Sequence, residues 1–495
     1  MKRAPFNYAI AAGHELTANT AVQIIKAGGN IFDAAIAAFM ASWIAEPCMS
    51  SAGGGGFATV CQANGNSQVF DFFCQTPAFK RPVEEVEFFP VLLDFGSTKE
   101  AFHVGRGAVA VPGSVAGIFE LHKKLGYMPI RELVLPAMEI ARAGVKMSDF
   151  QHSNVVLLKP IFNISERSKE IFFIENQVKT TGSLVKMPLL ADFLDLIAHE
   201  GPSVFYKGEI AKKIVADQKE NGGYLTRKDL EEYAVIERSP LTFSLAQHKV
   251  LTNPQPSLGG HILMDFLKEG QWNTKKISWL SRSHLRELYR VFQKTTSGKA
   301  DYDHLVYPGN KESGNNKRGS TTHISILDKQ GNAISLTVSN GEGCGYYIEN
   351  TDIHLNNMLG EAALMPDGFH NWRPYTRLYS MMSPSLVLNQ EEKPEMVIGT
   401  GGAGRIPYAI AQVLLNRFYF DRSLSEAVNA PRTHLQEGIF NEEPGFDSTN
   451  FLPNSQVKRW DKKSLYFGGT QVTALENGIL SAVGDERRRG VGLVF

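Results

Sequence analysis

Two adjacent threonines, Thr321 and Thr322, stand where a polar run meets an alternating segment. The run 307–320, YPGNKESGNNKRGS, is broken by glycines and predicts an exposed loop that can be cut. A cut between Ser320 and Thr321 would free an α-amine, whose pKa of roughly 7.7–8.0 suits it to take the proton of the threonine's own hydroxyl. The junction therefore indicates a threonine that supplies both nucleophile and base. The alternative is that the doublet is only β-branched strand material.

The residues that follow Thr321 predict a β-hairpin. The sequences THISIL and AISLTVS flank the turn segment DKQGN, and both alternate with a period of two. If Leu327 faces Ala333, then Thr321 faces Ser339. One face of the hairpin is then largely aliphatic, and the other carries Thr321, His323, Ser325, Ser335, Thr337 and Ser339. This register places a hydroxyl directly opposite the candidate nucleophile.

A glycine loop in MVIGTGGAGRIPYAIAQVLL, residues 396–415, joins a predicted strand to a predicted helix. Loops that enter helices can offer main-chain N–H groups to an oxyanion. The loop also permits a rival interpretation, since GTGGAG over Gly399–Gly404 satisfies the dinucleotide-binding pattern. That pattern needs an acidic residue at the end of a second strand about twenty residues further on. Asp421 lies near that distance, but DRSLSEAVNA predicts a capped helix there.

The composition argues against several classes of partner. Among 495 residues, Lys plus Arg and Asp plus Glu each number 51, and the one basic run noted is the short DERRRG, so we expect neither nucleic acid nor a membrane as partner. Four cysteines without CxxC spacing argue against a zinc ribbon or a disulfide framework. The N-terminus lacks an apolar secretion segment, so we expect a cytoplasmic protein. No metal-ligand spacing occurs, and no cofactor is expected.

The remaining chain alternates irregularly between helix-like and strand-like segments. We expect a helix that stops at Gly28–Gly29, a buried helix in IFDAAIAAFMASWIAEPC, a hairpin that turns at Asn64–Gly65, and a mostly helical region over 114–240. No repeat or domain linker is visible. Several polar side chains are expected to be structural rather than catalytic: the helix-capping Asn30 and Asp33, the ion-pairing Arg405 and Arg432, and His14, His323 and His434.

Further segments make the chain resemble the gamma-glutamyltranspeptidase family over nearly its whole length. In order they are IIKAGGNIFDAAIAA, EPCMSSAGGGGFATV, VPGSVAGIFELHKKLG, LVLPAMEIARAG, YLTRKDLEEY, TTHISILDKQGNAISLT, HLNNMLGE, YSMMSPSLVL, NAPRTH and GGTQV. A single match of this kind would mean little. The number of matches and their order make the resemblance specific.

The resemblance implies an N-terminal nucleophile hydrolase with an α+β fold, a four-layer αββα sandwich made as a zymogen. Residues 1–495 would form one intertwined domain that cuts itself between Ser320 and Thr321. The large segment 1–320 and the small segment 321–495 would stay associated, with a homodimer left open. Thr321 would take the γ-glutamyl group of a small-molecule donor such as glutathione and pass it to water or an amine. Ser339 would support this nucleophile, and main-chain amides of Gly402 and Ala403 would form the oxyanion hole.

The positions implied to bind substrate depart from the family in several ways. Phe73 and Cys74 replace an arginine–glutamate pair, and a phenyl ring cannot form the paired, charge-assisted bonds that a guanidinium gives a carboxylate. Ser380 and Met381 replace a serine doublet. Glu361 keeps the acidic position that would bind a donor ammonium.

Two further positions also differ from the family. Met358 replaces a glutamine. Asn340 lies one place before the expected asparagine, which swaps strand faces unless a bulge corrects it.

Two hypotheses of function remain. The first is a self-processing gamma-glutamyltransferase or hydrolase, or an acylase of the same family with a non-glutamyl donor. The second is a non-catalytic homologue used for binding. Retention of Thr321, Ser339 and the glycine loop favours the enzyme, and the loss of the arginine at position 73 predicts weak turnover of glutathione.

Overall fold

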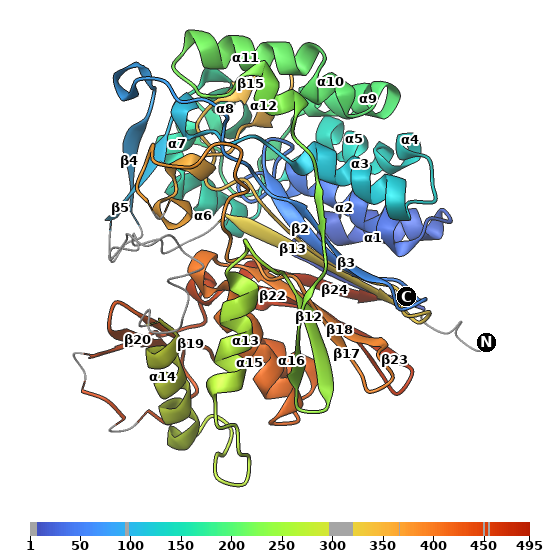
Figure 1. Cartoon of the computed structure of the whole chain (residues 1–495), viewed down its shortest axis with the longest axis vertical. Helices are drawn as coiled ribbons and strands as arrows, with labels where there is room; N and C mark the ends of the chain where they lie inside the picture. The colour runs from blue at the N-terminus through green and yellow to red at the C-terminus, as the bar shows by residue number, and fades with distance from the viewer. Residues whose placement is uncertain (1–6, 95–98, 297–319, 366, 449–450, 454–455) are drawn as a thin grey trace.

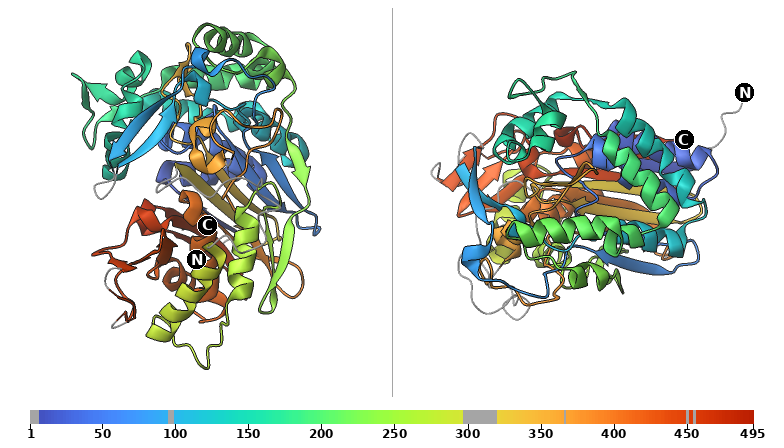
Figure 2. Two further views of the ribbon diagram at one scale, coloured as in Figure 1. Left: turned by 60° about the vertical axis from the view of Figure 1, so that its left-hand side comes forward. Right: turned by 90° about the horizontal axis from the view of Figure 1, so that it is seen from above.

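The computed structural model describes residues 7–94, 99–296, 320–365, 367–448, 451–453 and 456–495. The predicted exposed loop at 307–320 lies outside the described residues except for Ser320. Two β-sheets lie face to face across the middle of the molecule, with one group of helices above them and another below (Figure 1). The predicted four-layer αββα sandwich is confirmed, and Figure 2 shows the same layers from two other sides.

The first sheet has seven strands in the order β10-β3-β2-β14-β13-β1-β24. Their bounds are β1 Tyr8–Ala12, β2 Gly55–Cys61, β3 Ser67–Phe72, β10 Ile236–Arg238, β13 Thr321–Asp328, β14 Ala333–Ser339 and β24 Val491–Val494. The central pair β13–β14 is antiparallel and has the predicted register, with Thr321 opposite Ser339 and Leu327 opposite Ala333. The hairpin β2–β3 turns at the predicted Asn64–Gly65 position.

The second sheet has six strands in the order β11-β12-β17-β18-β22-β23. Their bounds are β11 Leu241–Leu245, β12 His248–Thr252, β17 Ser385–Leu388, β18 Pro394–Gly401, β22 Gly469–Glu476 and β23 Ile479–Gly484. Strand β18 packs across β13 and β14 of the first sheet. Both sheets take strands from before and after residue 321, so the two parts of the chain share one architecture.

Helix α2 (Ile31–Ala45) covers the aliphatic face of the β13–β14 hairpin, and α1 (Glu15–Lys26) packs beside it over β1 and β24. Asn30 begins α2 as predicted, because its side chain accepts hydrogen bonds from the main chain of Phe32 and Asp33, and Asp33 returns the bond. Every residue of α2 is buried, which explains why its sequence is apolar on all sides.

The outer layer of the second sheet consists of α13 (Gly259–Glu269), α15 (Ile406–Phe418) and α16 (Leu424–Asn429), with α14 (Arg282–Thr296) beside them. Helix α16 begins at Ser423 with a capping box, as DRSLSEAVNA predicts. A core of leucine, valine and aromatic side chains fills the space between this layer and the sheet.

The mostly helical region continues the first outer layer. Its helices are α3 Ser114–Leu125, α4 Ile130–Leu133, α5 Leu135–Ala143, α6 Asp149–Leu157, α7 Lys159–Phe162, α8 Glu166–Phe172, α9 Pro188–Glu200, α10 Ser203–Tyr206, α11 Glu209–Glu220 and α12 Arg227–Glu231. Minor strands are β4 Phe89–Asp94, β5 Lys99–Val104, β6 Val145–Lys146, β7 Phe173–Ile174, β8 Gln177–Val178, β9 Leu184–Val185, β15 Tyr347–Ile348, β16 Ile353–His354, β19 Thr433–Gln436, β20 Ile439–Glu442 and β21 Val457–Arg459. None of the helices in the described ranges combines the length and apolar character needed to cross a bilayer.

Candidate active site

Thr321 opens β13, and the hydroxyl of Ser339 lies beside the peptide bond that precedes it. Ser339 Oγ donates a hydrogen bond of 2.7 Å to the main-chain oxygen of Ser320 and accepts one of 3.1 Å from the N–H of Gly341. Because the Gly341 N–H occupies an acceptor position of this hydroxyl, the hydroxyl proton is directed at the Ser320 carbonyl. A hydrogen bond to a carbonyl oxygen draws electrons from its carbon, so this bond prepares the Ser320 carbonyl for attack.

The polar face of the hairpin faces the second sheet. Ser325 Oγ donates to the main-chain oxygen of Gln471 and Ser335 Oγ to that of Ile398, both at 2.9 Å. His323 lies between Thr337 Oγ1 at 2.7 Å and Ser325 Oγ at 2.9 Å. Burial lowers the pKa of His323 to about 3, so the ring is neutral near pH 7. These contacts hold the two sheets together, and His323 is structural as predicted.

The glycine loop begins at Gly401, which lies against the main chain of Thr321. A Cβ atom at Gly401 would lie 2.1 Å from the Thr321 main-chain oxygen, so only glycine fits at this end of β18. The next two residues have positive φ angles, 140° at Gly402 and 50° at Ala403. Ala403 is strained there because its Cβ disfavours the left-handed region. The loop therefore leaves β18 from a point in contact with the Thr321 main chain.

The dinucleotide-binding interpretation of this loop is wrong. Strand β18 pairs antiparallel with both neighbours, β17 and β22, whereas the dinucleotide motif needs a parallel βαβ unit. Asp421 lies in an exposed turn after α15, not at the end of a strand, and forms an ion pair with Arg417.

Arg488 is a site residue that the sequence did not identify. Its Nη1 donates a hydrogen bond of 2.6 Å to the main-chain oxygen of Thr321. The preceding residues anchor it through buried ion pairs, Arg432 with Asp485 at 2.6 Å and Arg487 with Asp485 at 3.1 Å. The predicted ion pair of Arg432 is therefore confirmed. In the sequence DERRRG is only a short basic run, because a contact with Thr321 across the fold leaves no local signal.

Glu46 holds the other side of the nucleophile strand. Its carboxylate accepts hydrogen bonds from Thr322 Oγ1 at 2.5 Å and from Thr17 Oγ1 at 2.9 Å. Burial raises the pKa of Glu46, while both hydroxyls and the charge of Arg488 act against that rise. The second threonine of the doublet thus anchors the strand to the end of α2, which leaves Thr321 as the residue beside Ser339.

Phe73 lies at the same end of the first sheet as Ser339, because Gly55 pairs with Ser339 and lies against Phe73. Its side chain is 2% exposed and stacks on Phe57, with ring centroids 5.4 Å apart. The structure therefore gives the ring a packing role. The nearby Arg377 uses its guanidinium on the main-chain oxygens of Phe73 and Ala234, so it also serves the core.

The other predicted substrate positions divide into two groups. Glu361 approaches the site, since a Cβ atom at Gly341 would lie 2.4 Å from its Oε1. Ser380 and Met381 are fixed by local bonds: the Ser380 hydroxyl accepts from the Met382 N–H at 3.0 Å, and the Met381 carbonyl accepts from Ser383 Oγ at 2.9 Å.

Asn340 and Met358 are also buried and held by their surroundings. Met358 is a core residue. No bulge interrupts the β13–β14 register, so Asn340 lies on the face opposite Ser339, and its amide donates to the His354 main-chain oxygen at 3.3 Å.

A pocket lies beside the Ser320–Thr321 bond. Its polar wall contains Ser320, Glu342, Arg405 and Arg488. Apolar and amide side chains complete it: Met49, Leu93, Asn154, Leu157, Leu158 and Leu465. The guanidinium of Arg405 also packs over the ring of Tyr466, 4.7 Å from the ring centroid, which is a structural contact of the kind predicted for this residue. Glu342 is a second residue that the sequence did not identify.

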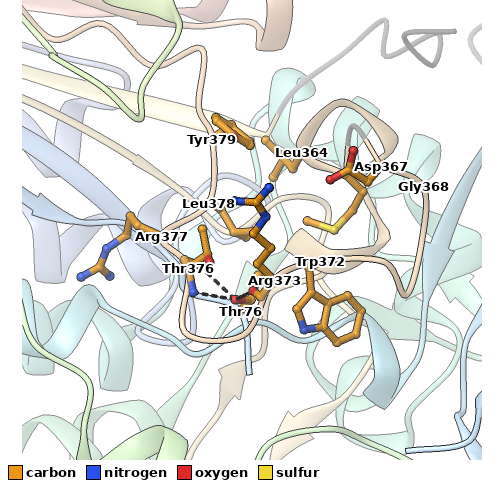
Figure 3. A pocket seen from close by; sticks show the side chains of 11 residues that line it. Thr76, Leu364, Asp367, Gly368, Trp372, Arg373, Thr376, Arg377, Leu378 and Tyr379 are labelled. Carbon is orange, nitrogen blue, oxygen red and sulfur yellow. Dashed lines mark hydrogen bonds between the residues drawn. The ribbon is translucent and has the colours of Figure 1, made fainter. Parts of the chain in front are cut away.

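A separate pocket (Figure 3) is lined by Thr76, Leu364, Met365, Asp367, Gly368, Trp372, Arg373, Thr376, Arg377, Leu378 and Tyr379. Thr76 Oγ1 donates 2.6 Å to the main-chain oxygen of Arg373, and the guanidinium of Arg377 points away from that of Arg373. Neither Thr321 nor Ser339 lines this pocket. Ser320, which precedes Thr321 in the chain, lines the first of these pockets and not the second.

A four-layer sandwich with a threonine at the start of a central strand defines the class of N-terminal nucleophile hydrolases. The sequence profile of the family described as Gamma-glutamyltranspeptidase matches residues 17–271 and 273–495. The chain belongs to the gamma-glutamyltranspeptidase family, an enzyme family of amide hydrolysis and acyl transfer.

Similar proteins support this assignment. The glutathione hydrolase proenzyme of Pseudomonas aeruginosa is 29% identical, with 98% of this chain and 94% of that protein covered. The Escherichia coli glutathione hydrolase proenzyme is also 29% identical, over 84% of this chain and 78% of its own length. A cephalosporin acylase from Bacillus halodurans shares the fold, with a TM-score of 0.80 at 21% identity over 100% of this chain and 97% of that one.

Proposed function

We propose that the chain cuts itself between Ser320 and Thr321 and then acts as an acyltransferase and amide hydrolase through Thr321. One observation carries the proposal: the Ser339 hydroxyl donates its 2.7 Å hydrogen bond to the carbonyl that such a cut must attack. The self-cleaving reaction needs a nucleophile next to an activated carbonyl, and these two groups belong to consecutive residues.

The cleavage proceeds in two steps, an acyl shift from nitrogen to oxygen and then hydrolysis of the ester. Thr321 Oγ attacks the Ser320 carbonyl carbon, and the oxyanion that forms keeps the hydrogen bond from Ser339. The C–N bond then breaks, the nitrogen takes the hydroxyl proton, and an ester joins Ser320 to Thr321 Oγ. Water hydrolyses the ester to a Ser320 carboxylate and a free Thr321 with its α-amine and hydroxyl.

The freed Thr321 can repeat the same chemistry on a substrate. Its α-amine takes the hydroxyl proton while Oγ attacks the amide carbonyl of an acyl donor, and the leaving amine departs with that proton. Main-chain amides of Gly402 and Ala403 stabilise the oxyanion. Water or a second amine then releases the acyl group from Thr321 Oγ.

The sheets support continued association of the two fragments after a cut. Strands β1, β2, β3 and β10 precede the cut, and β13, β14 and β24 follow it within one sheet. Separation would break main-chain hydrogen bonds between β1 and β13 and between β2 and β14. An exposed sheet edge of that length is strongly unfavourable.

We expect the preferred acyl donor to differ from glutathione in whether, and where, it carries a carboxylate. Arginine is absent at position 73, and the Phe73 ring is buried against Phe57. A buried carboxylate needs a cation beside it, and the cations that line the pocket beside Ser320 are Arg405 and Arg488 rather than a residue at position 73. Although relatives are named glutathione hydrolases, we expect this chain to turn over glutathione weakly and to prefer a donor whose carboxylate is absent, amidated or placed elsewhere.

The acyl-enzyme tests this function directly. Purified protein is incubated with glutathione or with p-nitroanilide donors, quenched in acid, and the 321–495 fragment is weighed by mass spectrometry. We expect an acyl adduct on Thr321, and Thr321→Ala should remove both adduct and turnover. Thr242→Val is the matched control, because it also removes a threonine hydroxyl but from an exposed position of β11. Turnover that persists in Thr321→Ala would overturn the proposed function.

A further inference from the structure

The pocket of Figure 3 has walls that main-chain hydrogen bonds hold in place. Residues 373–378 run along residues 74–76, where the Leu378 N–H donates to the Cys74 main-chain oxygen at 3.0 Å and the Thr76 N–H donates to that of Thr376 at 2.9 Å. The Thr76 hydroxyl accepts the Thr376 N–H at 2.8 Å. The pocket is therefore built into the fold, as sites for small molecules usually are.

Apolar side chains form most of the pocket wall. Leu364, Met365 and Leu378 are buried there, and Trp372 and Tyr379 add aromatic rings. The pocket has about 340 Å³ of empty space, part of which is open to solvent. This size and this lining are typical of a site for a small organic molecule.

Trp372 brings a buried hydrogen-bond donor to this wall. The residue is 7% exposed, and its indole N–H has no hydrogen-bond acceptor within the described part of the chain. An edge-on contact with the ring of Tyr224, with centroids 4.7 Å apart, fixes the indole in place. A buried indole N–H usually has an acceptor. A ligand that enters the pocket can supply the missing acceptor.

The charged groups around Trp372 favour an anionic acceptor. Lys80 Nζ lies 5.2 Å from the centroid of the Trp372 ring. Arg373 and Arg377 line the pocket, and Asp367 is the acidic residue that lines it. Positive charge therefore exceeds negative charge around the ring. A carboxylate gains from this excess, and its oxygens accept hydrogen bonds strongly.

We propose that the pocket of Figure 3 binds a small monocarboxylate with an apolar body. The carboxylate accepts the hydrogen bond of the Trp372 N–H within the positive field of Lys80 and Arg373, and the apolar body packs on the leucines of the wall. This site is separate from the acyl site, because neither Thr321 nor Ser339 lines it. The ligand binds here without reacting.

Calorimetry with three probes of similar size tests the charge of the ligand. 3-Phenylpropionate carries a carboxylate, 3-phenylpropionamide carries a neutral amide, and 3-phenylpropylamine carries an ammonium. We expect wild-type protein to bind the propionate about tenfold more tightly than the amide and to bind the amine most weakly. Tighter binding of the amine than of the propionate would assign the pocket to Asp367 and overturn the proposal. Equal binding of the propionate and the amide would also overturn it.

Two variants test the groups that bind the ligand. Trp372→Phe keeps an aromatic ring and removes the indole N–H, so it should weaken binding of the propionate and of the amide by about five- to tenfold, because each has an acceptor oxygen. Arg373→Met should weaken binding of the propionate by about threefold and leave the amide unchanged, because a charge at an exposed position is lost.

The matched control is Arg131→Met, which removes a guanidinium from an exposed position of α4. It should leave the affinity for every probe unchanged. Circular dichroism checks that each variant is folded. Unchanged affinity for the propionate in folded Trp372→Phe would show that the indole N–H does not bind the ligand, and it would overturn the proposal.

Binding to Thr321→Ala separates this site from the acyl site. The variant lacks the proposed nucleophile, which does not line the pocket. We expect 3-phenylpropionate to bind to Thr321→Ala as tightly as to wild type, whether or not the wild type turns over any donor. Loss of binding in folded Thr321→Ala would place the probe in the acyl site and overturn the proposal.

Discussion

The guanidinium of Arg488 donates a hydrogen bond of 2.6 Å to the main-chain oxygen of Thr321, although the two residues are 167 positions apart. This bond and the close contact of Gly401 fix the carbonyl of the nucleophile from the side of the second sheet. Thr322 is anchored to Glu46 on the opposite face. The backbone of Thr321 is therefore held from both faces of the strand, which leaves its hydroxyl as the group free to approach the Ser320 carbonyl.

Loss of the Arg488 guanidinium should slow self-cleavage. We expect Arg488→Met to lower the cleavage rate by about 10- to 100-fold, because one charge-assisted hydrogen bond to Thr321 is removed. Arg489→Met is the control, since Arg489 pairs with Asp149 at an exposed site. Gel densitometry of purified protein over time measures the rate. Equal rates in Arg488→Met and wild type would show that this bond does not position Thr321.

Ser339 should contribute to self-cleavage only through its hydroxyl group. We expect Ser339→Ala to slow cleavage by about 100-fold, because the carbonyl and its oxyanion lose their donor. Ser339→Thr keeps the hydroxyl and should retain most of the rate, provided the added methyl group fits. Circular dichroism checks that both variants are folded. A fast cut in Ser339→Ala would remove Ser339 from the mechanism.

The buried ion pairs behind Arg488 should contribute strongly to stability. Asp485 pairs with Arg432 and Arg487, and all three side chains are at most 1% exposed. We expect Asp485→Asn to lower the free energy of unfolding by about 3–5 kcal/mol, because Arg432 loses its buried counter-charge and Arg487 keeps only that of Glu443. Urea unfolding measures the change. Asp149→Asn breaks only an exposed pair and should change stability by less than about 1 kcal/mol.

Acid should destabilise the protein partly through His323. Its pKa is about 3 in the folded chain and 6.5 as a free side chain, so the unfolded state binds the extra proton between these values. The stability due to the neutral ring is complete above pH 6.5 and is lost as the pH falls toward 3. We expect His323→Gln to reduce the slope of unfolding free energy by about 1.4 kcal/mol per pH unit in this window. Parallel slopes for variant and wild type would contradict this.

Local patterns predicted the parts of the fold that depend on neighbouring residues. The alternation on both sides of DKQGN fixed the pairing of Thr321 with Ser339, and the Asn30–Asp33 cap follows from side chains three positions apart. The glycine loop before α15 was recognised as a strand-to-helix connection for the same reason. Resemblance to a family supplied the layer order, which no local pattern contains.

Contacts across the fold could not be predicted from the sequence. Arg488 reaches Thr321 from the other end of the small segment, and Glu342 reaches the pocket only because Gly341 turns the chain. The expected pocket role of Phe73 depended on side-chain direction, and the structure packs the ring on Phe57. Phe73→Arg is consequently expected to lower stability, since it would place a second guanidinium beside Arg377 in the core.

The N-terminal sequence and intact mass of the purified chain test the central claim most directly. The account predicts two fragments, 1–320 and 321–495, with the smaller one beginning Thr-Thr-His. Thr321→Ala should remain one chain of 495 residues, and Thr321→Ser should cut at a reduced rate. Persistence of the full-length wild type after long incubation, or a normal cut in Thr321→Ala, would contradict the claim that Thr321 is the nucleophile.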